Sequence, residues 1–181
     1  MPPTRNPELA ARKILRELDI KKAPISLDMI TEKLGIRLSL EPFDEELSGI
    51  LVKEGGAVAI GVNSTHSPKR QRFTIAHEIG HFILDHPGEM FIDKTVRQRA
   101  VVVRRDGRSS EGTDKHEIEA NRFAAELLMP SEIIEKVVKN RLSKSKMPST
   151  DELVSDMAAH FQVSSQAMEI RLVNLGFLIP Q

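Results

Sequence analysis

Apolar and polar positions repeat along the chain with two periods, and the change between the periods separates expected helices from expected strands. The pairs Asn6-Pro7 and Ser67-Pro68 mark helix starts, and Gly55-Gly56 marks the turn of a hairpin. The pattern predicts helices at residues 7–19, 27–34, 68–86, 115–129, 131–142, 150–160 and 164–175, and strands at residues 36–40, 48–52, 57–62 and 100–103. We therefore expect an α+β fold in which a small, largely antiparallel sheet packs on helices.

A basic, polar stretch over residues 143–149 interrupts the helical pattern near the C-terminus. Such a composition is typical of a linker. The expected organisation is one domain over residues 1–142, the linker, and a C-terminal helical pair over residues 150–181 that packs on or beside the domain.

The helix that begins at Pro68 carries the most informative motif of the chain, His77-Glu78-Ile79-Gly80-His81. Residues four positions apart lie on one face of a helix. His77 and His81 can therefore bind one zinc ion together, with Glu78 beside the ion as the catalytic base for a water molecule. Alone the motif is a modest signal, because two histidines and a glutamate recur by chance in unrelated chains.

A catalytic zinc ion needs a third protein ligand and keeps one position open. His86 does not fit the longer motif with a third histidine, because Leu84 and Pro87 stand where that motif requires glycine and histidine. We expect His86 to lie at the end of the helix, with its ring satisfied by a carbonyl group or by water.

The helix over residues 115–129 offers a carboxylate instead. Its period places Glu117 on the apolar face, where the small residues Ala120 and Ala124 allow another helix to approach closely. An unpartnered buried carboxylate costs several kcal/mol, so Glu117 is expected to bind the metal. Asn121, one turn later, can accept a hydrogen bond from the free nitrogen of a bound imidazole.

One alternative is that Glu117 forms an ion pair with Arg70 or Arg72 and binds no metal. The opposite face of the same helix is expected to be an ordinary solvated cluster of charges, made of Glu119, Arg122 and Glu126.

Composition narrows the classes of function. Lys+Arg and Asp+Glu both number 26, so no net charge draws the protein to nucleic acid or to an anionic membrane. The absence of cysteine excludes disulfides, thiolate ligands and cysteine nucleophiles. No stretch approaches the roughly 18 apolar residues of a membrane span. We therefore expect a cytoplasmic protein.

Two stretches together resemble the ImmA/IrrE family of metallopeptidases, namely Arg70–His81 and Glu117–Pro130. The tail over Phe161–Leu175 resembles the ending of that family. The resemblance implies a zincin-type fold with a thermolysin-like (gluzincin) zinc site, whose third ligand is the glutamate of an E-x-x-A-[ND] element. By position that glutamate is Glu117. The resemblance also implies cleavage of helix-turn-helix repressors and a role in the regulation of transcription.

The expected function is therefore zinc-dependent endopeptidase activity on a specific cytoplasmic protein, a helix-turn-helix transcriptional repressor. The alternative is a zinc-binding anti-repressor or sensor that acts by protein binding without turnover. Direct DNA binding by the C-terminal helices is disfavoured, because residues 164–175 contain a single basic side chain, Arg171. No membrane partner is expected.

The residue that stabilises the oxyanion is not assigned, because the chain has no tyrosine for this role. The candidates are His116, His66, His86 or an arginine within residues 97–108. Two further expectations concern the substrate. The strand at residues 57–62 precedes the motif helix and can pair with an extended substrate, and the basic stretch at residues 94–108 is expected to gate the cleft.

Overall fold

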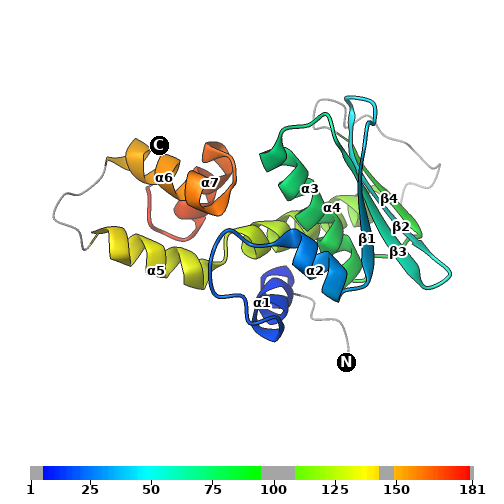
Figure 1. Cartoon of the computed structure of the whole chain (residues 1–181), viewed down its shortest axis with the longest axis horizontal. Helices are drawn as coiled ribbons and strands as arrows, with labels where there is room; N and C mark the ends of the chain where they lie inside the picture. The colour runs from blue at the N-terminus through cyan, green and yellow to red at the C-terminus, as the bar shows by residue number, and fades with distance from the viewer. Residues whose placement is uncertain (1–5, 95–108, 143–148, 180–181) are drawn as a thin grey trace.

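The computed structural model describes residues 6–94, 109–142 and 149–179 (Figure 1). Within these residues the fold is α+β, as predicted, with helices on one side of a mixed four-stranded sheet. The elements in chain order are α1 (Pro7–Glu17), α2 (Leu27–Lys33), β1 (Ile36–Glu41), β2 (Leu47–Glu54), β3 (Ala57–Asn63), α3 (Pro68–Ile83), β4 (Met90–Lys94), α4 (Ser109–Leu128), α5 (Ser131–Leu142), α6 (Thr150–Phe161) and α7 (Ser165–Asn174).

The strands lie in the order β1-β3-β2-β4. β2 and β3 form the predicted hairpin, and its turn residues Gly55 and Gly56 have φ values of 56° and 82°, a region that favours glycine. β4 pairs antiparallel with β2, whereas β1 pairs parallel with β3. The sheet is therefore antiparallel in two of its three pairings.

The sheet order corrects one prediction about the substrate. β3 lies between β1 and β2, so both of its edges are already paired and it cannot accept a substrate strand. β4 was not predicted from the sequence. In the described part of the chain β4 and β1 are the outer strands, and β4 leaves Met90 and Ile92 exposed. The strand expected at residues 100–103 and the gating stretch after Lys94 lie outside the described residues.

α3 packs against the inner face of the sheet and separates it from α4 (Figure 1). Leu51, Ile60 and Val62 on this face are fully buried. Gly49 shares the face, and a Cβ atom there would lie 2.4 Å from Cγ2 of Thr74 on α3. The helix can thus lie directly on β2 only because residue 49 has no side chain.

The boundaries of α3 differ from those predicted. Ser67 precedes it, but the Ser67 side chain makes no capping hydrogen bond. The helix ends at Ile83, before Pro87-Gly88, because the chain turns at Asp85, which has φ of 52° in the left-handed region. The residues after Asp85 are therefore free of the helix and can fold back on it.

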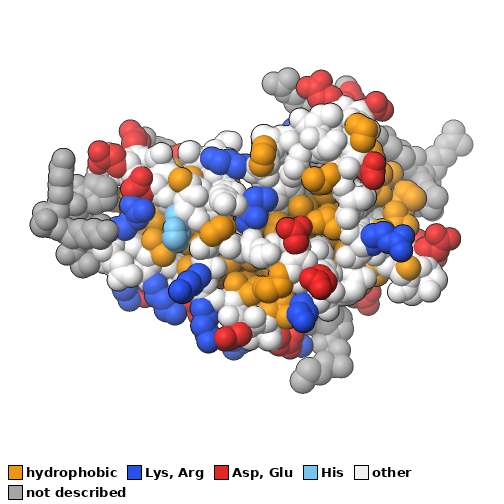
Figure 2. All heavy atoms as spheres, viewed as in Figure 1, with side chains coloured by type: hydrophobic (Ala, Val, Ile, Leu, Met, Phe, Trp, Pro, Cys, Tyr) orange, Lys and Arg blue, Asp and Glu red, His pale blue; other side chains and the backbone are white. Residues whose placement is uncertain are grey.

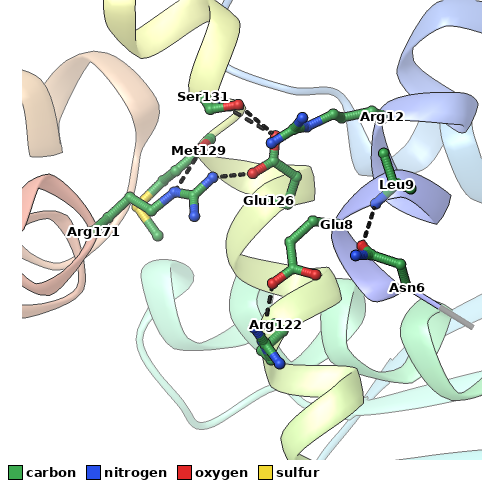
Figure 3. A network of polar contacts seen from close by, with 9 residues as sticks. All are labelled: Asn6, Glu8, Leu9, Arg12, Arg122, Glu126, Met129, Ser131 and Arg171. Carbon is green, nitrogen blue, oxygen red and sulfur yellow. Dashed lines mark hydrogen bonds and ion pairs between the residues drawn. The ribbon is translucent and has the colours of Figure 1, made fainter. Parts of the chain in front are cut away.

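Glu126 contradicts the expectation of a solvated charge cluster on α4. Its side chain is 1% exposed and accepts hydrogen bonds from Arg12 of α1, from Ser131 of α5 and from Arg171 of α7 (Figure 3). Arg171 also donates from Nε to the backbone oxygen of Met129 at 3.1 Å. The carboxylate therefore connects α4 to three other helices, of which α1 and α7 are distant in the sequence.

This network explains why a charged side chain occupies the interior of the helical layer. A buried charge is stable only when other groups compensate it. Burial tends to raise the pKa of Glu126, but the hydrogen bond from Arg12 and the charge of Arg171 outweigh it and lower that pKa. In contrast, Arg122 behaves as predicted, and pairs with Glu8 near the surface.

The surface agrees with the balanced composition. On the face shown in Figure 2, acidic and basic side chains both occur around the outline of the molecule, and no field of one sign covers it. Within the described residues, no helix has the length and apolar character needed to cross a bilayer. The division into a domain, a linker and a helical pair stays a prediction.

We expect Glu126→Gln to lower the free energy of unfolding by about 2–4 kcal/mol, because it leaves two arginines without their shared counter-ion. Urea denaturation at neutral pH measures this loss. Glu8→Gln is the matched control, since it removes an ion pair whose arginine is 62% exposed; that pair is worth less than about 1 kcal/mol. Equal losses for the two variants would contradict the role assigned to Glu126.

The same network predicts a pH dependence. Because the folded-state pKa of Glu126 is lowered, its contribution is present above the ordinary glutamate pKa and is lost as the pH falls through the folded-state value. The stability difference between wild type and Glu126→Gln should therefore shrink as urea titrations move from pH 7 into the acidic range below about pH 4. A stability difference between the two proteins that stays constant over this range would contradict a lowered pKa of Glu126 in the folded state.

Candidate metal centre

The two motif histidines and Glu117 meet where α3 packs against α4. His77 and His81, one turn apart on α3, bring their Nε2 atoms within 3.0 Å of each other. Oε2 of Glu117 lies 3.2 Å from Nε2 of His77, and Oε1 lies 3.2 Å from Nε2 of His81. The imidazoles are buried, whereas the carboxylate is 34% exposed, so the group opens to solvent beside Glu117.

These three side chains fit a divalent cation. One ligand atom from each lies within 4.8 Å of the others, and no second group of this kind occurs in the described part of the chain. Ligands about 2.0–2.1 Å from a tetrahedral zinc ion are separated by about 3.3–3.4 Å, close to the 3.0–3.2 Å found here. Two imidazole nitrogens and a carboxylate oxygen are also donors that zinc accepts.

The alternative arginine partners of Glu117 are engaged elsewhere. Arg70 donates a hydrogen bond to Oγ of Ser48 at 2.8 Å, and Arg72 donates to the backbone oxygen of Ile25 at 2.9 Å. The carboxylate of Glu117 instead faces the histidine pair. Glu117 therefore lies on the face of α4 that meets α3, where the helical period predicts it.

The outer nitrogens of both imidazoles are occupied as well. Nδ1 of His77 lies 3.0 Å from Oδ1 of Asn121, the contact expected from the sequence. Nδ1 of His81 lies 2.9 Å from Nδ1 of His86, and Nε2 of His86 lies 3.2 Å from Oε2 of Glu119. Both rings are thus held with Nε2 turned inward, the orientation that a metal ligand needs.

His86 and Glu119 are two residues whose environment was predicted wrongly. His86 is 3% exposed, and its ring contacts His81 and Glu119 where a carbonyl group or water was expected. Glu119 is only partly exposed and faces this histidine. The physical reason is the early end of α3 at Ile83, since the turn at Asp85 returns the chain toward the helix.

Glu78 lies beside the group without a partner of its own. It is buried, and neither oxygen of its carboxylate has a hydrogen-bond partner in the structure. Gly49 of β2 provides the space, because a Cβ atom there would lie 3.4 Å from Oε1 of Glu78. A buried carboxylate without a donor is costly in a fold that has no use for it.

The surroundings of Glu78 shift its pKa upward. Burial raises the pKa of Glu78 to about 8; Asp93 and Glu117 also raise it, whereas the charge of His77 lowers it. Asp93, on β4, was not singled out in the sequence, because the strand that carries it was not recognised. A carboxylate of raised pKa is a stronger base than an ordinary glutamate.

The contacts within the group also shift the pKa values of its members. Burial alone would lower the pKa of His77, but the hydrogen bond with Glu117 and the charge of Glu78 raise it to about 9. Burial likewise tends to raise the pKa of Glu117, and its hydrogen bonds with His77 and His81 instead hold it well below its usual value. Protons compete with a cation for these ligand atoms, so the affinity for the cation should fall as the pH is lowered.

Gly80 sets the distance between α3 and α4. A Cβ atom on Gly80 would lie 3.1 Å from Cδ1 of Phe123 and 3.2 Å from both Cα and the carbonyl oxygen of Ala120. The two helices therefore touch through a glycine and an alanine. This contact brings the carboxylate of Glu117, one turn before Ala120, within reach of the histidines.

The remaining oxyanion candidates lie in different places. His116 stacks on His86, with ring centroids 4.4 Å apart, and is thus behind the histidine pair. His66 precedes α3; its Nε2 lies 3.2 Å from the backbone oxygen of Glu45, and its buried Nδ1 has no hydrogen-bond partner. The arginine candidates at residues 97–108 lie outside the described residues.

Comparisons with known proteins give one matching family profile and a solved structure of similar fold. The sequence profile of the IrrE N-terminal-like domain, peptidase family M78, matches residues 31–173. A solved structure of a Mycobacterium tuberculosis transcriptional regulator shares the fold, with a TM-score of 0.56 and 17% sequence identity. The similarity covers 94% of this chain and 47% of that one, so the present chain spans about half the length of the regulator. No protein of curated function matches the sequence.

We expect Gly80→Val to separate α3 from α4, because the new side chain meets backbone atoms of Ala120 that cannot move aside. Overpacking of this kind costs about 1–3 kcal/mol, and affinity for a divalent cation should fall with it. Thermal unfolding and zinc titration measure the two effects. Lys136→Val, at an exposed position of α5, controls for the effect of placing a β-branched side chain in a helix. Unchanged zinc affinity in a Gly80→Val protein would contradict the spacing role.

Proposed function

The chain belongs to the peptidase M78 family of IrrE N-terminal-like domains, and from this premise we propose that it is a zinc-dependent endopeptidase. The observation that carries the proposal is the convergence of His77, His81 and Glu117, with the unpartnered carboxylate of Glu78 next to them. Family membership alone supports peptidase activity in general. The geometry supports the metal-dependent kind.

His77, His81 and Glu117 are the residues that would hold the ion. Zinc bound there supplies positive charge that makes a water molecule acidic near neutral pH and polarises a carbonyl group. Asn121 keeps the ring of His77 in place through its contact at Nδ1. The partly exposed side of Glu117 is where an extended peptide can approach, since the histidines are buried.

Glu78 is the proposed catalytic base. Its carboxylate takes one proton from the attacking water as the new C–O bond forms at the scissile carbonyl carbon. When the C–N bond breaks, the same carboxyl group returns that proton to the leaving amine. The absence of a competing donor at either oxygen leaves both free for this transfer.

The proposed substrate is a helix-turn-helix transcriptional repressor, and the proposed compartment is the cytoplasm, where such a repressor acts. The resemblance of Arg70–His81 and Glu117–Pro130 to ImmA/IrrE peptidases supports this choice. The balanced charge supports a protein partner rather than direct binding of nucleic acid.

We expect Glu78→Gln to bind zinc as wild type does and to cleave a repressor encoded beside its gene about 10²–10⁴-fold more slowly, because the amide cannot accept the proton. Fragment mapping by mass spectrometry measures cleavage, and chelator competition measures zinc affinity. His77→Ala is the control that should lose both properties.

The same experiment separates the peptidase from its main rival. A zinc-binding anti-repressor that only sequesters its partner would relieve repression equally well with Glu78→Gln. Release of a reporter gene by the variant, with no repressor fragments from the wild-type protein, would overturn the proposed activity.

His66 is the proposed oxyanion-stabilising residue among the three histidine candidates. Its Nδ1 is unpartnered, and its charge acts on Asp93, whose pKa is raised mainly by burial and which in turn raises the pKa of Glu78. We expect His66→Ala to lower kcat about 10²–10³-fold while zinc affinity stays unchanged. An equal loss in His116→Ala, whose ring stacks behind the site, would count against the assignment.

A further inference from the structure

The contacts behind His81 involve two side chains that belong neither to the ligand group nor to the proposed base. We propose that His86 and Glu119 form a relay that positions the imidazole of His81. In this relay Nδ1–H of His81 donates to Nδ1 of His86, and Nε2–H of His86 donates to Oε2 of Glu119. The relay rests on the proposed function, because it requires a cation at Nε2 of His81.

The distances between the ring nitrogens allow only one placement of the protons on His81 and His86 when a cation binds Nε2 of His81. A hydrogen bond between two ring nitrogens needs one donor and one acceptor. When Nε2 of His81 presents its lone pair to a cation, the ring's proton is on Nδ1, which lies 2.9 Å from Nδ1 of His86. His86 must then accept at Nδ1 and carry its own proton on Nε2, which lies 3.2 Å from the Glu119 carboxylate.

The backbone fixes His86 in the position that the relay requires. Its N–H donates to the carbonyl oxygen of His81 at 3.1 Å, which closes the turn made by Asp85. Lys53 of β2 reaches across and donates from Nζ to the carbonyl oxygen of His86 at 2.8 Å. Both polar ends of the residue's main chain are thus held.

Packing fixes the ring itself. It meets His81 edge to face, with centroids 4.9 Å apart, and stacks on His116 at 4.4 Å. The residue is 3% exposed, and both of its nitrogens are engaged. No N–H of His86 is left to reach a substrate, so the arrangement supports a positioning role and not contact with the oxyanion.

The two motif histidines are therefore held by different partners. The ring of His77 meets a neutral amide oxygen of Asn121, whereas the ring of His81 is connected through His86 to the charge of Glu119. A carboxylate behind an imidazole fixes its tautomer and makes it a better ligand. The intervening ring allows a carboxylate on α4 to do this from a greater distance.

The test is the zinc affinity of the full chain, measured by chelator competition on folded protein. We expect His86→Ala to weaken the zinc Kd by about 10–100-fold, the usual effect of losing an outer partner of a ligand. In His86→Asn, Oδ1 takes the place of Nδ1 as acceptor, so this variant should recover most of the affinity. Glu119→Ala, which breaks only the outer link, should fall between wild type and His86→Ala.

Two control variants exclude other causes. Lys115→Ala removes the other ionic neighbour of Glu119, at 3.8 Å, and should leave zinc affinity unchanged. His160→Ala removes an exposed histidine of α6 and controls for weak surface binding of zinc.

A spectroscopic readout tests the protons directly. In zinc-loaded wild type, ¹⁵N NMR of the imidazoles should show Nδ1 of His81 protonated and Nδ1 of His86 unprotonated. A histidine that merely fills the core has no reason to adopt this tautomer.

The outcomes are separable. A zinc Kd for His86→Ala within twofold of wild type, or a proton on Nδ1 of His86, overturns the relay alone. If His86→Ala does not fold, the comparison of His86→Asn with Glu119→Ala decides, and equality of both with wild type overturns the relay. A wild-type protein that binds no zinc overturns the proposed function, and the relay with it.

Discussion

The close contact of α3 with α4 at Gly80 is the constraint on which the rest of the site depends. The histidines are fixed relative to each other by one turn of a single helix, but Glu117 belongs to another helix, and only the distance between the two axes brings it near. That distance is set where a hydrogen atom of Gly80 faces Ala120 and the ring of Phe123. Gly80 thus contributes to the site through packing, although it has no functional group.

Two buried carboxylates on these helices differ in their hydrogen-bond partners. Glu126 accepts hydrogen bonds from side chains of three other helices and stabilises their packing on α4. Glu78, in contrast, is left without any donor on a face where Gly49 removes the side chain that would have covered it. A fold selected for stability alone would satisfy both in the same way.

The sequence predicted what depends on local geometry. The helical period placed Glu117 and Asn121 on the face that meets the histidines, and the glycine pair at residues 55 and 56 gave the hairpin. The cap at Asn6 also forms as its residue type indicates. Each of these inferences needs only neighbours within a few positions.

What the sequence did not predict depends on contacts between distant segments. Glu126 looked solvated because its partners, Arg12 and Arg171, come from the two ends of the chain. His86 was misplaced because the left-handed turn at Asp85, a residue with no glycine-like signal, ends the helix early. β4 has only five residues and contains the partly buried Asp93, so its pattern alone did not mark it as a strand.

The unpartnered carboxylate of Glu78 has one more consequence, which concerns the stability of the protein. The buried His77, Glu78 and His81 lie together with the partly exposed Glu117, and a divalent ion is the component that would compensate them. Occupancy of the centre would then contribute to the folding equilibrium, since a ligand that binds only the native state stabilises it. In a cell starved of that ion, the molecule would become more prone to unfolding and degradation. Metal supply would thus set how long each copy persists.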